Sequence, residues 1–293
     1  MPMTWTLGQL QTFVVVAERG SMTRAAEALG YSIGAVSQHM SALRRTVGSD
    51  LVIRRGRSLV LTEAGRTLLP RARSILAAQA QAELAMLGRD FEREAIVTLG
   101  VFGSTPTIGL PLIVRLLAER HPDIVVRARE VNVETMSAAV IDGAIDLGIG
   151  IDYPAVPLPP MRGLTWTTVA AEDFGVVTPA GRPLPSPGEL AEADWILPPA
   201  TDLFGRAMRL ATSALGIQAK ESHIVTDTAV ALALAGTGLG LTLATPIMMS
   251  LGGPDVALHP VTGAGGREII VLTVPAPSAP VAAVAEVVAE VFA

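Results

Sequence analysis

From residue 95 onward, the chain alternates short runs of apolar, strand-forming residues with longer helical stretches. The patterns favour strands at 96–102, 124–130 and 145–151, with helices between them at 106–121 and 133–142. This β-α-β-α-β order favours parallel strands with right-handed crossovers, and helices packed against the sheet. We therefore predict an α/β fold for this part of the chain.

A second α/β set follows a proline-rich stretch at 153–160. We expect strands near 166–170, 174–178, 194–197, 221–225 and 239–244, and helices near 202–216 and 227–236. The last strand, 268–274, and the last helix, 281–292, have no partners in this set, so we assign them to the first sheet. The chain then crosses between two lobes near 162–166 and 261–267, which predicts a hinge and a cleft.

The first 50 residues have a different texture. Helical spacing of apolar residues predicts helices at 7–19, about 22–29 and about 33–47. Gly20 and Gly30 suit the ends of the first two helices, and Ser32 suits the N-cap of the third. The third helix is expected to turn Val36, Met40 and Leu43 inward. Its opposite face carries small or hydrogen-bonding groups, as a face that enters a groove requires: Gly34, Ser37, Gln38, Ser41 and Arg45.

Two short β-rich runs, 51–53 and 59–61, flank a turn that contains Arg54, Arg55 and Arg57. Three arginines at one hairpin tip repel each other, and this arrangement is costly unless a nearby anion offsets the repulsion. Residues 1–73 carry ten Arg against four acidic residues, a formal charge of +6, which leaves −11 for the rest. A basic head on an acidic body indicates a polyanionic partner for the head alone.

Thr62 is expected to cap a long helix that continues to about residue 93. Its apolar residues form a stripe with no core of its own, and such a stripe typically packs against a partner helix. The stripe comprises Leu68, Ala72, Ile75, Leu76, Leu84, Leu87 and Phe91. We therefore expect a homodimer that forms through the 63–93 helix.

Several functions are disfavoured by composition and spacing. The chain has no Cys, which excludes thiol catalysis, Cys-ligated zinc and a thiol redox sensor. The four His residues lie far apart and match no metal motif, so we expect no metal, no cofactor and no catalytic residues. The glycines of 236–240 follow a helix rather than a strand, which indicates a helix stop and not a dinucleotide loop.

Targeting signals are not expected. The first apolar stretch, 13–17, is short and runs into Glu18, so we predict no secretory signal peptide and a cytoplasmic protein. The chain has no charge between Asp227 and Asp255, but glycines and Pro246 interrupt this stretch. We expect buried elements there rather than a membrane helix.

About 60 N-terminal residues resemble the winged helix-turn-helix of LysR-type transcriptional regulators. The resemblance rests on Ala25-Ala26, Leu29, Ser37, Leu43, Gly48, Leu51, Arg54 and the run Leu61-Thr62-Glu63-Ala64-Gly65. The rest of the chain is similar to the family's effector-binding domain more loosely, best at 142–147 and 236–246. The family commonly has Gln-Pro where this chain has Ile33-Gly34, which removes a common base-contacting side chain.

The resemblance implies a domain plan and a function. A winged helix-turn-helix at 1–62 and a linker helix at 63–93 would precede an effector-binding domain at 94–293. The two lobes of that domain, about 95–162 plus 266–293 and about 163–265, resemble type 2 periplasmic binding proteins. The family plan implies a ligand-responsive regulator of transcription, and a tetramer made of two dimers that bends its DNA. A dimer would bind an inverted repeat of double-stranded DNA with half-sites about 10 base pairs apart, or a multiple.

The predicted DNA contacts lie on the outward face of the third helix, the hairpin tip and the second helix. Gln38 can hydrogen-bond adenine in the major groove and Ser37 can reach a base or phosphate, although a solvated surface is the alternative. The arginines of the tip suit phosphates or a narrow minor groove. The full set is Thr23, Arg24, Ser32, Gly34, Ser37, Gln38, Ser41, Arg54, Arg55 and Arg57.

The predicted effector contacts lie at strand ends and helix starts around the cleft. Ser104 and Thr105 open a helix, where free N–H groups and hydroxyls bind anions, although a plain N-cap is the alternative. Thr226 is expected to cap a helix in the other lobe, and Phe204 to wall the cleft. The full set is Gly103, Ser104, Thr105, Asn132, Val133, Phe204 and Thr226. The effector is expected to be a small organic acid.

Two other classes share parts of this pattern. A periplasmic-type solute-binding protein would have the two-lobed plan of residues 95–293. The basic head and the expected lack of a signal sequence argue against this class. An enzyme with a DNA-binding head would need a catalytic constellation, and no such motif is present.

Overall fold

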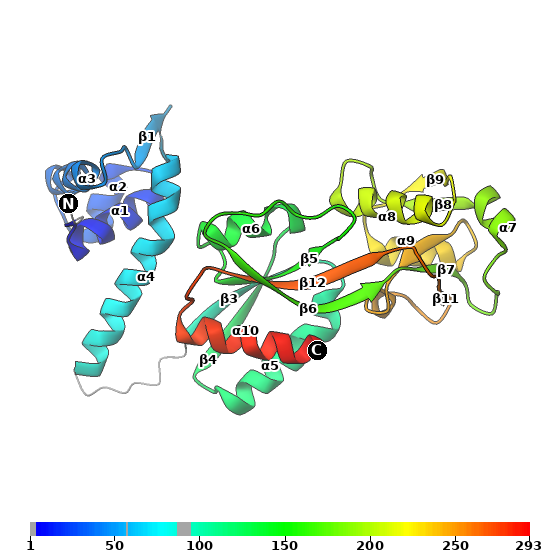
Figure 1. Cartoon of the computed structure of the whole chain (residues 1–293). Helices are drawn as coiled ribbons and strands as arrows, with labels where there is room; N and C mark the ends of the chain where they lie inside the picture. Colours follow the sequence, from blue (N-terminus) through cyan, green and yellow to red (C-terminus); the bar gives the residue numbers. More distant parts are fainter. Residues whose placement is uncertain (1–3, 57, 87–94) are drawn as a thin grey trace. The chain divides into compact units, whose positions relative to one another are not determined.

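The computed structural model describes residues 4–56, 58–86 and 95–293 (Figure 1). The chain divides into two compact units, one of residues 1–93 with 141–144 and one of residues 94–140 with 145–293. Each unit is described separately below.

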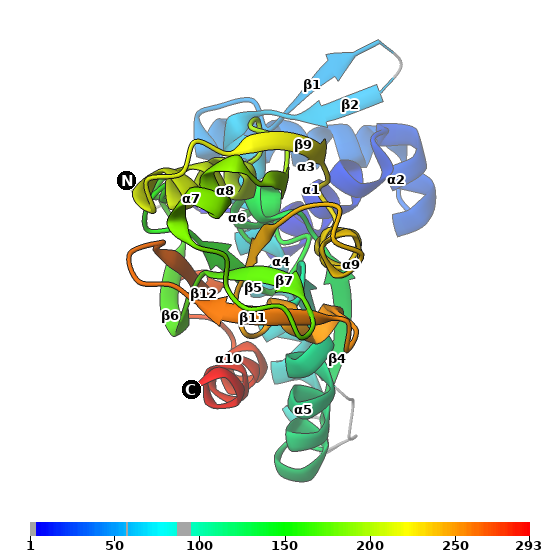
Figure 2. The ribbon, with the colours of Figure 1, turned by 90° about the vertical axis from the view of Figure 1, so that its right-hand side faces the viewer.

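The first unit is a three-helix cluster followed by a hairpin and a long helix. A positive φ of 61° at Gly20 closes the first helix, and Ser21 and Ser32 accept backbone N–H bonds at the starts of the next two. The β1–β2 hairpin projects from the helix cluster (Figure 2). The elements are α1 (Leu7–Arg19), α2 (Met22–Leu29), α3 (Ile33–Val47), β1 (Val52–Arg55), β2 (Ser58–Leu61) and α4 (Glu63–Met86).

The long helix α4 differs from expectation in how it packs. Leu68, Leu69 and Ala72 are buried in one hydrophobic core with residues of α1, α2 and α3, and Ile75 and Leu76 pack against that core. The stripe therefore has an intramolecular partner over the first half of the helix, which overturns our prediction of a stripe without a core. The α1 residues Leu10, Phe13 and Val16 belong to the same buried core. Leu87 and Phe91 lie outside the described residues.

The first lobe of the second unit is built on a five-stranded sheet in the order β4-β3-β5-β12-β6. Strand β3 pairs in parallel with β4 and β5, as the β-α-β-α-β pattern predicts, and β12 pairs antiparallel with β5 and β6. Its strands are β3 (Ala95–Val101), β4 (Ile124–Glu130), β5 (Leu147–Asp152), β6 (Thr165–Asp173) and β12 (Gly266–Thr273).

Helices cover both faces of this sheet. The helices α5 (Thr105–Arg120) and α10 (Ala279–Phe292) lie side by side on one face, and α6 (Val133–Ile141) lies on the other (Figure 1). Close packing of α5 on α10 depends on Gly109, because a Cβ there would meet the ring of Phe292 at 2.4 Å. The predicted return of the last strand and helix to the first sheet is confirmed.

The second lobe has two small sheets. One has the order β10-β7-β11 with antiparallel pairing, and the other pairs β8 with β9 in parallel. Figure 2 shows β7 and β11 side by side. The elements are β7 (Gly175–Pro179), α7 (Pro187–Glu192), β8 (Asp194–Leu197), α8 (Leu203–Ala214), β9 (Lys220–Ile224), α9 (Thr228–Gly236), β10 (Thr242–Ala244), a 3-10 turn (Met248–Leu251) and β11 (Val256–Pro260). The sequence patterns missed α7, β11 and the 3-10 turn.

The first crossing between the lobes lies later in the chain than predicted. We expected 162–166, but β6 belongs to the sheet of the first lobe and the chain crosses where β6 passes into β7, at 173–175. The lobe boundary at 163 is corrected accordingly. The second crossing, between β11 and β12, lies at 260–266, as expected. Gly265 there has a φ of 68°, a conformation that glycine adopts without strain.

The uncharged stretch from Asp227 to Asp255 forms α9, a turn at Gly238 with a φ of 80°, and β10. Ala231, Leu232 and Ala235 of α9 are buried in the core of the second lobe. Within the described residues, no helix is both long and apolar enough to cross a bilayer.

Candidate functional site

The outer face of α3 is exposed along its length. Gly34, Ser37 and Gln38 are exposed and Ser41 is half-buried, whereas Val36, Met40 and Leu43 are buried beneath them. Ser32 uses its hydroxyl as the N-cap, accepting from the N–H of Ala35 at 3.1 Å. The amphipathic pattern predicted for this helix is therefore confirmed, and most of its small polar face is exposed.

The hairpin beside α3 presents its arginines to solvent. Arg54 and Arg55 are exposed, and Arg54 Nε donates to the carbonyl of Gly56 at 3.4 Å. The N–H of Leu59 donates to the carbonyl of Gly20 at 2.8 Å, which ties the hairpin to the turn between α1 and α2. The hairpin therefore has a fixed place relative to the helices. Arg57 lies outside the described residues.

Thr23 and Arg24 are exposed in the first turn of α2. The N–H of Arg24 donates to the Ser21 hydroxyl at 3.5 Å, so the backbone of this turn is held by its cap. The exposed face of α3, the start of α2 and the hairpin arginines together form a polar, basic surface of the first unit.

A cavity of about 510 Å³ lies between the two lobes of the second unit. Every predicted effector residue except Thr105 lines it. The lining residues include Gly103, Ser104, Asn132, Val133 and Tyr153 from the first lobe, and Asp202, Phe204, Thr226, Asp227 and Met248 from the second, with Arg267 from β12. A cavity of this volume and mixed lining is typical of a small-molecule site.

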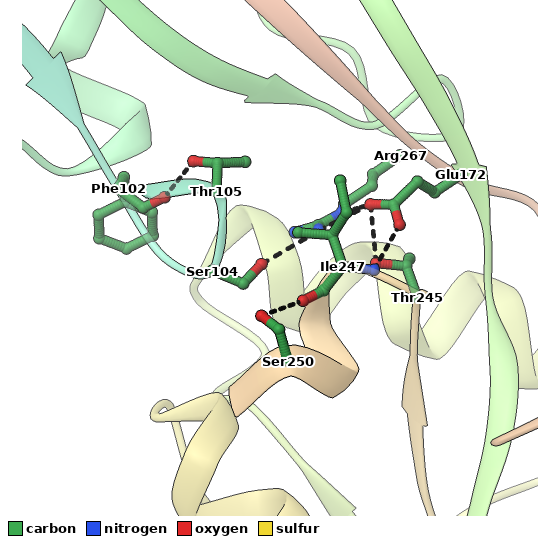
Figure 3. Close-up of polar contacts among 8 residues, drawn as sticks. All are labelled: Phe102, Ser104, Thr105, Glu172, Thr245, Ile247, Ser250 and Arg267. Carbon is green, nitrogen blue, oxygen red and sulfur yellow. Dashed lines mark hydrogen bonds and ion pairs between the residues drawn. The ribbon is translucent and has the colours of Figure 1, made fainter. Parts of the chain in front are cut away.

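Ser104 and Thr105 have different roles at the start of α5. The Thr105 side chain is fully buried and its hydroxyl donates to the carbonyl of Phe102 at 2.9 Å, so it faces away from the cavity (Figure 3). This corrects our expectation of two hydroxyls available to a ligand. The Ser104 side chain forms no N-cap hydrogen bond to α5; it lines the cavity, and its Oγ accepts from Arg267 Nη2 at 3.1 Å.

A buried ion pair joins the two strands that cross between the lobes. Arg267 on β12 and Glu172 on β6 are register partners, and their side chains are only 2% and 8% exposed. Arg267 donates to Glu172 Oε2 from Nε at 2.9 Å and from Nη2 at 2.7 Å. Glu172 also accepts from the Thr245 hydroxyl at 2.9 Å and from the N–H of Ile247 at 2.7 Å, both in the second lobe (Figure 3).

This network joins both lobes to the cavity. Through Arg267 it reaches Ser104 of the first lobe, and through Glu172 it reaches Thr245 of the second. Arg267 lines the cavity although its side chain is only 2% exposed, and its hydrogen bonds to Glu172 and Ser104 run from Nε and Nη2.

Three aromatic rings pack together at the cavity. Tyr153 stacks on Phe204 with ring centroids 5.8 Å apart and on Phe174 at 6.4 Å, so residues of both lobes and of the hinge are in contact. Burial raises the pKa of the Tyr153 phenol well above its usual range, and the positive charge of Arg267 only partly opposes this rise. The Tyr153 hydroxyl therefore stays protonated at neutral pH.

The chain's own side chains occupy several helix N-termini around the cavity. Asn132 accepts from the N–H of Glu134 at 2.9 Å at the start of α6, and Asp227 accepts from the N–H of Val230 at 3.1 Å in α9. Asp227, not Thr226, is thus the N-cap of α9, which corrects our assignment. Glu134 reaches from the first lobe to the second, where it accepts from the N–H of Leu203 at 2.9 Å.

Sequence reasoning missed Arg267, Tyr153 and Glu134. Arg267 opens a strand after a glycine pair, and Tyr153 begins the proline-rich stretch, so both were assigned to connections rather than to the cleft. The one signal that could have identified Arg267 is its place at the start of an apolar strand, where a buried arginine needs a charged partner. Among the described residues, no cluster of three or more His, Asp or Glu side chains is arranged to hold a metal ion.

The two units thus define a class of protein: a winged helix-turn-helix unit joined to a two-lobed unit with a ligand-sized cavity. The description "Bacterial regulatory helix-turn-helix protein, lysR family" matches residues 7–66, and "LysR substrate binding domain" matches residues 92–293. A "Probable hydrogen peroxide-inducible genes activator" of Mycobacterium avium is 30% identical over 255 residues, which cover 87% of this chain and 78% of that protein.

Solved structures show the same fold. Full-length OxyR of Pseudomonas aeruginosa, in a form with one cysteine replaced by aspartate, has a TM-score of 0.69 at 19% identity, covering 99% of this chain and 95% of that one. Full-length CbnR in complex with its target DNA has a TM-score of 0.57 at 23% identity, covering 98% and 100%. The chain belongs to the LysR family: it is a transcriptional regulator with an N-terminal helix-turn-helix and a C-terminal effector-binding domain.

Proposed function

We propose that this regulator binds an inverted-repeat operator through α3 and the hairpin, and that a small organic anion in the inter-lobe cavity controls it. The observation that carries the proposal is the ligand-sized cavity with Arg267 and Ser104 in its wall, on a chain that also exposes a polar recognition helix. The purified protein should retard DNA from its own promoter region in a gel, and the binding should weaken as the salt concentration rises. A DNA fragment without an inverted repeat should compete poorly. Membership of the LysR family disfavours a periplasmic solute-binding protein, and a cytoplasmic location follows from the proposal.

The proposed DNA contacts divide into two kinds. We expect Ser37, Gln38 and Ser41 on α3 to meet base edges, because a recognition helix lies in the major groove. The others are placed to meet the phosphate backbone or the minor groove, where charge and short side chains position the protein without selecting sequence. This second set is Thr23, Arg24, Ser32, Gly34, Arg54, Arg55 and Arg57.

Gln38→Ala should relax the preference at one base step by about 1–3 kcal/mol, because the amide is placed to read one base pair. Arg55→Ala should instead weaken all sequences alike and lower the salt slope by about one unit, because it removes one phosphate contact. Binding to a set of single-base operator variants at several salt concentrations measures both. Arg162→Ala, which removes an exposed arginine from the other unit, is the control for charge. An unchanged ranking of operators by Gln38→Ala would show that Gln38 reads no base.

Ser104 and Arg267 support the anionic class of the effector. The Ser104 hydroxyl, the Arg267 guanidinium and the start of α5, which has no side-chain cap, lie together at one corner of the cavity. Four carboxylates also line the cavity, Glu130, Glu134, Asp202 and Asp227; of these, Glu134 and Asp227 accept from N–H groups at the starts of α8 and α9. An anion is therefore expected at the Ser104–Arg267 corner, with its apolar part against Phe204, Val133 and the Tyr153 ring.

Ser104→Ala should weaken binding of the effector by about 1.5–3 kcal/mol, because it removes a hydroxyl donor to a charged acceptor. A thermal-shift screen of small organic acids identifies the ligand first, since a ligand at 100 times its Kd adds about 2.7 kcal/mol of apparent stability. Titration calorimetry with the selected acid then compares the variants. Ser250→Ala, whose hydroxyl donates to the carbonyl of Ile247, is the matched control outside the cavity lining. Equal affinity of Ser104→Ala and wild type would remove this corner from the site.

Peroxide sensing by a thiol is not part of the proposal. The Mycobacterium avium relative is described as a probable activator of hydrogen peroxide-inducible genes. This chain has no Cys, and oxidation of a thiolate to a sulfenic acid or disulfide needs one. We infer that this regulator responds to a bound molecule and not to oxidation of a cysteine.

The proposal also includes assembly. A homodimer through the 63–93 helix, paired into a tetramer, would present two recognition helices to an operator with two-fold symmetry. Residues of α4 up to Leu76 pack on their own unit, so the dimer contact is expected in the later part of that helix. Sedimentation of the full-length protein measures the oligomeric state directly.

A further inference from the structure

The polar outer face of α3 contains one large apolar side chain. Ile33, the first residue of the helix, is 53% exposed and takes no part in the core that the described residues of this unit form. Positions 33 and 37 lie one turn apart and share a face, so Ile33 stands next to Ser37 on the surface proposed to meet base edges. Because 53% of its surface stays exposed after folding, the isoleucine keeps apolar surface that an intermolecular contact can cover.

The backbone around Ile33 is held in place before any contact is made. Ser32 caps the helix, the N–H of Tyr31 donates to the carbonyl of Ala26 at 3.0 Å, and the Tyr31 ring meets the His39 ring edge-on at 5.8 Å. Ile33 therefore projects from an ordered turn. A β-branched side chain in a helix also has one strongly preferred χ1 rotamer, so little side-chain entropy is lost on binding.

We propose that Ile33 is a specificity-determining residue that packs against the 5-methyl group of a thymine in the major groove. The proposal rests on operator binding through α3 as proposed above. Thymine alone among the four bases presents a methyl group in this groove, and N-terminal residues of a recognition helix reach base edges. The contact removes two apolar surfaces from water together.

The same contact disfavours cytosine at that position. Cytosine has a hydrogen where thymine has the 5-methyl group, so the side chain of Ile33 meets no apolar partner there. Both kinds of base pair present one amino donor and two acceptors in the major groove, so these polar groups do not distinguish the pairs for an aliphatic side chain. Ile33 therefore selects thymine through the methyl contact.

The test uses the full-length protein and DNA duplexes that wild type selects from a random-sequence library. Each thymine of one half-site is replaced in turn by uracil, which lacks only the methyl group, and the dissociation constant is measured at fixed salt. At one thymine, uracil should weaken wild-type binding about fourfold, the value expected for one buried methyl-sized group. Ile33→Ala should bind the thymine and uracil duplexes equally, and Ile33→Val should keep most of the discrimination.

Ile224→Ala is the matched control, because Ile224 of the effector-binding domain has the same exposed fraction of 53%. It should discriminate thymine from uracil as wild type does. If wild type binds its operator but tolerates uracil at every position, or if Ile33→Ala keeps the discrimination, the assignment of Ile33 is overturned and operator binding stands. If wild type enriches no sequence and binds no DNA, the proposed function itself fails, and the assignment with it.

Discussion

Arg267→Met should lower the free energy of unfolding of the effector-binding domain by about 3–5 kcal/mol, because it leaves the Glu172 carboxylate buried without its cation. Glu172 would keep only the Thr245 hydroxyl and the N–H of Ile247 as donors. Urea unfolding followed by tryptophan fluorescence measures the effect, since Trp166 and Trp195 both lie in this unit.

The double variant Arg267→Met, Glu172→Leu should recover most of that loss, since an apolar pair can replace a buried ion pair of similar volume. Arg120→Ala, which breaks the exposed pair with Glu290, should have a much smaller effect. If Arg267→Met unfolds at the same urea concentration as wild type, the ion pair does not stabilise the lobes.

Phe13→Ala should destabilise the DNA-binding domain by about 3–5 kcal/mol, because it opens a cavity where the ring is fully buried among α1, α2, α3 and α4. In a domain of this size such a loss approaches the whole stability. Operator binding measured by anisotropy should therefore fall steeply, while the thermal shift that an effector produces in the other unit stays.

Leu7→Ala is the control on the same helix, because Leu7 is 40% exposed. It should bind DNA nearly as wild type does. Retention of full operator affinity by Phe13→Ala at the growth temperature would contradict the assigned role of this ring in the core.

The sequence was sufficient for most of the architecture because both units use strong local signals. Helices α1 to α3 follow from helical spacing with glycine stops, and the parallel pairing of β3 with β4 and β5 follows from their alternation with helices. The lobe assignment of β6 was wrong because a strand next to a hinge can pair with either sheet. Only the antiparallel pairing of β6 with β12, a contact between residues about 100 positions apart, decides it.

The candidate sites were predictable to different degrees. The proposed recognition face belongs to one helix, so local periodicity was enough to predict which of its residues are exposed. The cavity depends on residues that long-range contacts bring together, such as Glu172 and Arg267, and neither carries a motif. Thr105 was misassigned because a hydroxyl at a helix start is equally suited to bond a nearby carbonyl, and here it bonds that of Phe102.

The register pairing of Arg267 with Glu172 has a mechanical consequence. Rotation of one lobe against the other turns about the crossing strands, and groups on the axis of a rotation move least while distant groups move through the longest arcs. Because Glu172 and Arg267 lie next to the two crossings, we expect the ion pair to keep its geometry if the lobes rotate. A ligand bound beside it would then move little, while a small change in angle there would be magnified along each lobe.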